Sequence, residues 1–326
     1  MTRREEVLRA FQGQAEGQPL YLADLTLWHT WHEARGTLPS AWQAGSLLEV
    51  SHRLGSPAWL PIQAWQAEFS GINVETIETA NARSITYETS LRRLEARWVL
   101  GPDGDWWQSQ YPIRSEEDLE AGLELAESTT YMLRPSALSK ARDEVGDSGV
   151  VALELPKRPY SAILHDYIGW SEGLLLLGEP EIESMISVLE SKLQTLVGDI
   201  AQLPGGIVLS PDNLDGQFVS PGAFERYLTG SYRRTVEILH GHGKQLVAHV
   251  GGPAARLLDS LAATGLDGIQ GVCGPPQSDT PLPEARRIVG PGVILWGGIP
   301  QDILLDTQSR EHFEQTVIRI ASEASA

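Results

Sequence analysis

Residues 206–252 decide the fold: GIVLSPDNLDGQFVSPGAFERYLTGSYRRTVEILHGHGKQLVAHVGG. The apolar run at residues 207–209 follows a Pro-Gly-Gly break, which predicts a buried strand. Residues 210–219 form a polar loop, and Ser220 and Pro221 then begin a helix that runs to about residue 240. A second strand begins at residue 245 and ends at His249. Strand, loop, helix and strand form the βαβ unit of a parallel sheet covered by helices.

The same alternation extends through residues 149–326, which we expect to form the β/α core of a single domain. Further strands are predicted at 150–155, 268–271 and 292–296, with helices at 180–202, 252–263, 283–289 and 309–321. Alternation of this kind predicts a (β/α)8 TIM-type barrel, whose chemistry collects at the carboxyl ends of the strands.

Residues 1–148 are expected to form a helical and β-meander part of the same domain. Within it, residues 71–111 change character, because short segments rich in β-branched and aromatic residues alternate with turn signals such as Gly-Pro-Asp-Gly at 101–104. The pattern predicts an antiparallel β meander inserted in the barrel.

The charge and composition of the chain argue against several classes of function. The formal net charge is −18 and the sequence pI is about 4.8, so the surface repels phosphate backbones and anionic lipids and argues against nucleic-acid or membrane binding. No apolar run approaches the ~20 residues of a transmembrane helix, and the first residues lack the apolar core of a signal peptide. The chain has one cysteine, Cys273, so no intrachain disulfide can form. We expect a cytoplasmic protein.

Candidate site residues follow from position. Asp212, Asn213 and Asp215 lie in the predicted strand-to-helix loop, where an aspartate could orient a substrate or act as a general base, although an ordinary loop before a helix is equally consistent. His249 ends the next strand. His165 and Tyr167 follow the strand at 150–155, and they either face the barrel mouth or lie on a helix surface.

An aromatic segment stands near the amino terminus. It contains Trp28, His29, Trp31 and His32, which could line a substrate pocket, bind a metal or hold a quaternary ammonium by cation–π attraction. The alternative is that the tryptophans fill the core and the histidines cap loops.

Several stretches together resemble the uroporphyrinogen decarboxylase superfamily, which includes corrinoid-dependent methyltransferases. They are Arg3-Arg-Glu-Glu-Val-Leu-Arg-Ala10, Tyr111-Pro-Ile-Arg-Ser-Glu-Glu-Asp-Leu119, Gly178-Glu-Pro-Glu-Ile182, and residues 213–225, 243–252 and 292–299. The resemblance implies a (β/α)8 barrel. Members of this superfamily continue beyond a helix such as 309–321 into a last barrel strand, so we expect that strand to be missing from this chain.

The two branches of the superfamily imply different sites. Enzymes that act on porphyrins hold the substrate carboxylates with several arginines near the amino terminus, whereas residues 24–45 contain Arg35 alone. The methyltransferase branch implies a zinc ion bound by a His-X-Cys pair and a third ligand. Here His249-Val-Gly lacks the first cysteine, but Cys273 follows His249 by 24 residues, at the end of the next strand.

Neighbouring strands lie roughly 5 Å apart, so His249 and Cys273 could share a metal. The third ligand would be Asp212, Asp215, His165 or a residue beyond the last one of this chain. The competing interpretation is that Cys273 is a small buried apolar residue and that His249 binds the substrate directly.

The resemblance therefore favours methyl transfer from a small methylated compound to a corrinoid carried by a partner protein. One alternative is decarboxylation of uroporphyrinogen or another carboxylic acid without a cofactor, with Asp212 stabilising the intermediate. Another is a non-catalytic relative that binds a ligand. Homodimers are common among relatives, so a second copy of the chain is a candidate partner.

Overall fold

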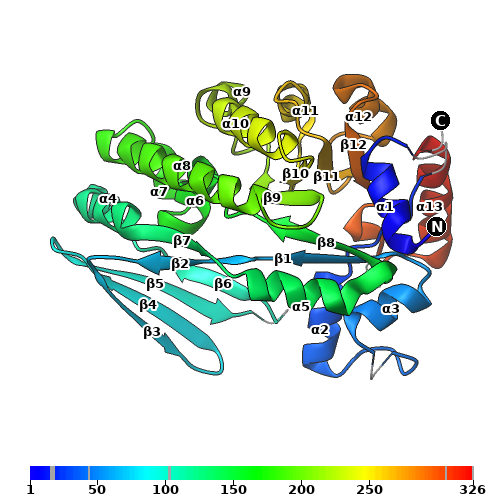
Figure 1. The fold of residues 1–326 in the computed structure, drawn as a ribbon, viewed down its shortest axis with the longest axis horizontal. Helices are drawn as coiled ribbons and strands as arrows, with labels where there is room; N and C mark the ends of the chain where they lie inside the picture. Colours follow the sequence, from blue (N-terminus) through cyan, green and yellow to red (C-terminus); the bar gives the residue numbers. More distant parts are fainter. Residues whose placement is uncertain (15–18, 43–44, 102–103, 305–306, 325–326) are drawn as a thin grey trace.

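A computed structural model describes residues 1–14, 19–42, 45–101, 104–304 and 307–324. Its centre is a parallel sheet of six strands that curls into a half-barrel (Figure 1). The strand order is β1 (Ala58–Ile62), β8 (Gly149–Glu154), β9 (Ile207–Leu214), β10 (Gln245–Val250), β11 (Gly268–Cys273) and β12 (Ile294–Gly298). From β8 onward, spatial order follows chain order, as the βαβ pattern predicts.

Helices cover the outer face of this sheet. They are α8 (Pro180–Ala201), α10 (Thr229–His240), α11 (Ala255–Ala262) and α12 (Leu282–Val289), and α13 (Arg310–Ala324) packs on α12. Alternate strand residues such as Leu153, Val208 and Leu246 join the main apolar core beneath these helices, because successive side chains of a strand point to opposite faces. No helix among the described residues is long and apolar enough to cross a membrane.

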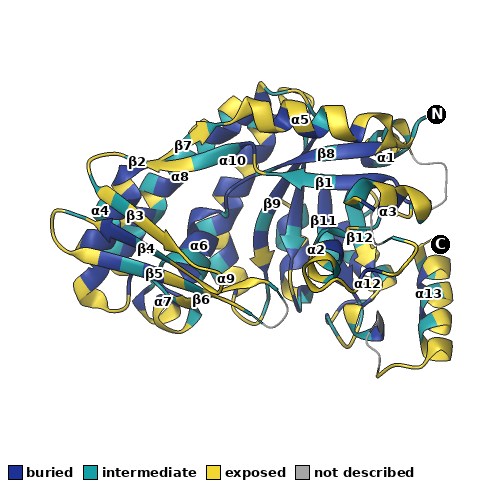
Figure 2. Ribbon diagram, turned by 90° about the horizontal axis from the view of Figure 1, so that it is seen from below, coloured by how far each residue is buried: buried dark blue, intermediate teal, exposed yellow. Residues whose placement is uncertain are grey.

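The other set of alternate residues fills the concave inner face. Val150, Ile207 and Val247 pack there with Trp59 of β1 and Trp296 of β12, whose rings meet edge to face with centroids 4.5 Å apart. Helix α1 (Arg3–Phe11) closes the amino-terminal ends of the strands with two buried side chains, Val7 and Phe11. The bottom of the half-barrel is therefore a packed apolar floor. Figure 2 shows that β8 and β9 are largely buried.

The prediction of a (β/α)8 barrel that lacks its last strand is correct only in part, because the described residues form a half-barrel of six parallel strands. The apolar residues at 20–25 are compatible with a further strand, but this segment is irregular in the structure and pairs with neither edge of the sheet. The segment instead crosses between the two edges. The Leu22 carbonyl accepts a hydrogen bond of 3.1 Å from the indole nitrogen of Trp296, and the Ala23 amide donates to Ser56 Oγ at 3.0 Å.

The antiparallel meander is confirmed. It comprises β3 (Asn73–Glu78), β4 (Ala82–Glu88), β5 (Arg93–Leu100) and β6 (Trp106–Gln110). Leu94 and Ala96 of β5 pack against α4 (Leu119–Ser128). A separate antiparallel pair, β2 (Trp65–Phe69) with β7 (Thr129–Leu133), connects this region to β1.

Shorter helical elements complete the chain. They are α2 (Thr26–Arg35), α3 (Leu47–Arg53), η1 (Glu116–Asp118), α5 (Pro135–Val145), η2 (Gly146–Ser148), α6 (Pro159–Ala162), η3 (Ile163–Tyr167), α7 (Trp170–Leu176), α9 (Pro221–Ala223), η4 (Phe224–Leu228) and η5 (Gln301–Leu304). Two of them, η3 and η4, are single π-helical turns directly after the short helices α6 and α9. Such turns insert one residue into a helix and are frequent near functional sites.

Candidate functional site

Polar side chains replace apolar ones on the inner face where the strands approach their carboxyl ends. On β8, Val150 and Ala152 belong to the inner apolar cluster, and Glu154 is the next residue of the same parity. On β10, Val247 belongs to that cluster and His249 follows with the same parity. Period-two alternation therefore places Glu154 and His249 inside the half-barrel, above the apolar floor.

Two more polar residues belong to this layer. Gln270 of β11 is paired in register with His249, and its side-chain amide donates to Asp24 Oδ2 at 3.4 Å. Asp24 lies in the irregular segment at 20–25, whose Leu22 packs in the inner cluster. We name Asp24, Glu154, His249 and Gln270 the mouth cluster.

His249 is held in its neutral form. Burial lowers the pKa of its imidazole, while the charge of Asp24, a side-chain hydrogen bond with Gln270 and the charge of Asp212 oppose that shift. Its Nδ1 atom is buried and no described residue offers it a hydrogen bond. A neutral ring with a free nitrogen can accept a proton, bind a substrate hydrogen or ligate a metal.

Glu154 is the acidic counterpart. Burial raises the pKa of its carboxyl group, the charge of Lys157 lowers it, and the charge of Asp24 raises it. No hydrogen bond or ion pair reaches this carboxyl group from the described part of the chain, since Lys157 instead pairs with Asp166, its Nζ 2.8 Å from Asp166 Oδ1. A carboxyl group with a raised pKa is suited to proton transfer.

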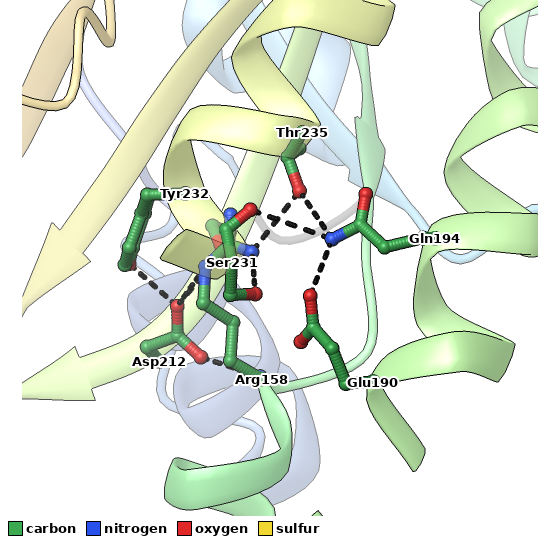
Figure 3. A network of polar contacts seen from close by, with 8 residues as sticks. Arg158, Glu190, Gln194, Asp212, Ser231, Tyr232 and Thr235 are labelled. Carbon is green, nitrogen blue, oxygen red and sulfur yellow. Dashed lines mark hydrogen bonds and ion pairs between the residues drawn. The ribbon is translucent and has the colours of Figure 1, made fainter. Parts of the chain in front are cut away.

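Asp212 lies on the outer face of the sheet, away from the mouth cluster. The loop expected at residues 210–219 starts later, because β9 continues to Leu214, and Asp212 is a strand residue on the outer face beneath α10. Its carboxylate accepts hydrogen bonds from the Arg158 amide at 2.6 Å, from Ser210 Oγ at 2.8 Å and from the Tyr232 hydroxyl at 2.6 Å. The Arg158 guanidinium lies 3.4 Å away (Figure 3).

Arg158 extends this network toward α8. Its guanidinium stacks 3.6 Å from the centre of the Tyr232 ring and donates to Ser231 and Thr235 at 2.8 and 3.1 Å. Gln194 of α8 donates to the same Thr235 hydroxyl at 3.1 Å. Arg158 and Asp212 are almost completely buried, so this ion pair joins β8, β9, α10 and α8 and does not open into the half-barrel.

Asn213 and Asp215 pack against the end of β10. A Cβ atom added to Gly251 would lie 1.7 Å from Asn213 Oδ1, and one added to Gly252 would lie 2.4 Å from Asp215 Oδ2. The Gly251-Gly252 pair is therefore needed because these side chains occupy its space. Asn213 has a left-handed φ of 51°, and Asp215 Oδ1 also accepts from the Gln217 amide at 2.7 Å.

His165 and Tyr167, both on the π-helical turn η3, point into different surroundings. Burial lowers the pKa of His165, whose Nε2 has no partner among the described residues and whose ring meets Trp170 edge to face. Tyr167 packs among apolar residues shared by α4 and the meander. The structure thus separates these two candidates.

The aromatic segment makes local contacts. On α2, Trp28 packs edge to face on Trp42, and the His32 ring contacts Trp28 at a tilt and Trp31 edge to face. His29 Nε2 lies 2.9 Å from the Gly45 carbonyl, and His32 Nδ1 lies 2.9 Å from Thr37 Oγ1. Both histidines therefore hold the loop that follows α2, as expected if the segment is structural.

The described residues bring no third ligand to His249 and Cys273. His249 and Cys273 lie on neighbouring strands, but the residue in register with His249 is Gln270, whereas Cys273 is in register with Gly298. Burial raises the pKa of the Cys273 thiol, which favours the protonated form that does not bind metal. Within the described ranges, no three His, Cys, Asp or Glu side chains form a group that could hold a metal ion.

Comparison with known proteins gives one informative result. No protein-family description matches the chain, and no curated protein matches it. Among solved structures, a methyltransferase from Methanosarcina mazei is similar over 99% of this chain and 90% of its own length, with a TM-score of 0.59 and 13% identity. At this identity the likeness shows the fold, which is that of a methyltransferase-like half-barrel.

Of the mouth cluster, His249 was expected from the sequence, whereas Asp24, Glu154 and Gln270 were missed. A signal for Glu154 was present, because it has the parity of Val150 and Ala152 in a strand that was predicted correctly. The position of Asp24 had no such signal, since residues 20–25 do not form a strand.

Proposed function

We propose that the chain is an enzyme of the uroporphyrinogen decarboxylase superfamily that transfers a methyl group from a small compound bound above the apolar floor, at the mouth cluster. The observation that supports it most is that two groups suited to proton transfer lie at the carboxyl ends of β8 and β10, the two parallel strands on either side of β9. His249 Nδ1 and the Glu154 carboxyl group have no hydrogen-bond partner among the described residues. Such strand ends are where barrel enzymes hold their substrates. The shared fold with a methyltransferase is consistent with this reaction.

The residues have distinct tasks in this reaction. Methyl transfer breaks a bond between carbon and a heteroatom, and the heteroatom that leaves is stabilised by a proton. Glu154, whose raised pKa keeps more of it protonated, would donate that proton. The neutral His249 and the Gln270 amide would orient the methyl donor, and Asp24 fixes Gln270. A corrinoid carried by a partner protein would supply the methyl acceptor.

A cofactor-independent decarboxylation is the second candidate. It is favoured by the same Glu154, because a protonated carboxyl group can protonate the carbanion that remains after CO2 leaves. In this reading Glu154 on the inner face takes the part expected of Asp212, whose carboxylate already has its partners on the outer face.

The first test is a methyl-transfer assay. Purified protein is mixed with reduced cobalamin and, in turn, methanol, the methylamines and dimethyl sulfide, and loss of the reduced-cobalamin absorbance is followed. We expect turnover with one donor class, lowered at least about 100-fold in His249→Ala and in Glu154→Gln. His312→Ala is the matched control, because His312 is an exposed histidine on α13.

Three outcomes separate the candidates. Turnover that depends on His249 and Glu154 supports methyl transfer, and release of CO2 from added carboxylic acids in place of methyl transfer supports the decarboxylase. Ligand binding without either reaction identifies a non-catalytic relative. Zinc analysis of the same wild-type, His249→Ala and Cys273→Ala samples shows whether a metal is bound through these side chains.

A further inference from the structure

A small cavity lies at the opposite end of the sheet from the mouth cluster. Its volume is about 40 Å³, and its walls come from α1, α5, the start of β8 and the turn before β9. A single water needs about 10–15 Å³ of such space, so the cavity can hold several waters or one small ion.

Two arginines line this cavity, Arg4 of α1 and Arg142 of α5. Neither guanidinium has a hydrogen bond, ion pair or ring contact with any described residue. The guanidinium groups of Arg114, Arg233 and Arg256 also lack partners within the described ranges, but those residues are exposed and reach water freely, whereas Arg4 and Arg142 are half-buried.

The surroundings make an uncompensated pair of cations costly. Leu8, Leu138 and Val145 form apolar walls, which weaken the screening by water. Lys244, which is 4% exposed, lies close enough to Arg142 to feel its charge. Its ammonium group donates to the carbonyls of Leu203 and Gly205, and burial together with the charge of Arg142 lowers its pKa.

The chain as a whole is strongly acidic, with 43 Asp and Glu against 25 Lys and Arg. Many arginines elsewhere are paired with carboxylates, such as Arg92 with Asp118 and Arg234 with Glu190. No carboxylate lines this cavity. Burial disfavours a charge that has no partner, so a bound anion would offset the charges of these two half-buried arginines.

We propose that Arg4 and Arg142 form a binding site for a small oxyanion, of the phosphate or carboxylate type, at the amino-terminal end of the sheet. Guanidinium groups bind such anions through two parallel hydrogen bonds. The anion would connect α1, which closes the floor of the half-barrel, to α5 and β8. It would therefore stabilise the fold from the side opposite to the mouth cluster.

The test is thermal unfolding of the full chain in inorganic phosphate, acetate or chloride at equal ionic strength. We expect phosphate at about 100 times its Kd to raise the Tm by several degrees over chloride. Arg4→Gln and Arg142→Gln should lose this increase, with phosphate binding at least about tenfold weaker by calorimetry. Arg256→Gln, which removes an exposed arginine without a partner, should keep it.

Equal Tm increases in all four proteins would show a general salt effect and overturn the proposal. If Arg142→Gln does not fold, Arg142→Lys replaces it, because lysine keeps the charge and loses the paired donors. Glycerol 3-phosphate distinguishes two sources of the anion: equal affinity indicates the phosphate end of a metabolite, and binding of inorganic phosphate alone indicates the free ion. The site shares no residue with the mouth cluster, so this result is independent of the methyl-transfer assay.

Discussion

Asp212 on the outer face of β9 and His249 on the inner face of β10 differ in whether their buried polar atoms have hydrogen-bond partners. On the outer face, Asp212 is almost completely buried and accepts three hydrogen bonds besides its ion pair with Arg158. On the inner face, His249 Nδ1 is buried without a partner among the described residues. A buried polar group with all its partners specifies the fold, whereas one without partners is available to a ligand.

This difference leads to opposite expectations for substitution. Changes on the outer face should lower the free energy of unfolding, because they leave a buried charge or donor without its partner. Changes in the mouth cluster should leave stability nearly unchanged and remove function. The expectations below run from the largest effect to the smallest.

The largest loss in the free energy of unfolding is expected for Asp212→Asn. The substitution keeps the shape of the side chain but removes the charge opposite Arg158, and breaking a buried ion pair in this way costs about 3–5 kcal/mol. Urea unfolding of the variant measures this loss directly. Asp215→Asn is the matched control and should cost less than about 1 kcal/mol, because an amide oxygen can still accept from the Gln217 amide.

Unfolding of Asp212→Asn at the wild-type free energy, with loss of turnover, would contradict this assignment. Asp212 would then act on the substrate, as one of the sequence-based hypotheses has it, and the comparison between the two faces would fail.

A smaller loss in the free energy of unfolding is expected for Tyr232→Phe. It removes the hydroxyl that donates to Asp212 at 2.6 Å and leaves the stacking of the ring on Phe224. A hydrogen bond to a charged group contributes about 1.5–3 kcal/mol, and the same urea experiment should show a loss in that range.

Tyr227→Phe provides the comparison for this variant. The Tyr227 hydroxyl also donates to a carboxylate, that of Glu183 at 2.8 Å, but Tyr227 and Glu183 are only partly buried. The loss should therefore stay below about 1 kcal/mol. Equal losses in the two variants would mean that burial does not strengthen the Asp212 network.

The strands that show a clear hydrophobic periodicity were predictable from the sequence. The strands β8 to β12 and the meander follow from apolar runs and turn signals. Residues 20–25 have an apolar pattern compatible with a strand, but their polar contacts include Trp296 and Ser56 at opposite edges of the sheet, besides Gln270. Such pairing is decided by tertiary contacts, which a local pattern does not contain.

The candidate site was less predictable for a related reason. The end of a strand decides which residues follow its alternation between the two faces, and a residue wrongly placed in a loop is assigned no face. Ending the strand at residue 209 placed Asp212 in a loop, although β9 runs to Leu214. Glu154 was overlooked because its strand is apolar on both sides, so its parity with Val150 and Ala152 does not by itself show that this is the inner face.

The smallest expected effect is a change of stability with pH, and its sign differs between Glu154 and His249 of the mouth cluster. The pKa of Glu154 is raised in the folded state, so stability from this group is present below the unfolded pKa of about 4.3 and is lost as the pH rises through the folded pKa. Glu154→Gln should therefore gain stability relative to wild type at pH 7 compared with pH 4. We expect less than about 1 kcal/mol, because the carboxyl group keeps part of its contact with water.

His249 should show the reverse dependence. Its pKa is lowered in the folded state, so stability is present above the unfolded pKa of about 6.5 and is lost as the pH falls. His249→Gln should therefore gain stability relative to wild type at pH 5 compared with pH 8. Urea unfolding at these pH values measures both variants. Parallel pH dependences would show that these groups do not titrate from opposite directions, and the proton-donor role of Glu154 would lose its support.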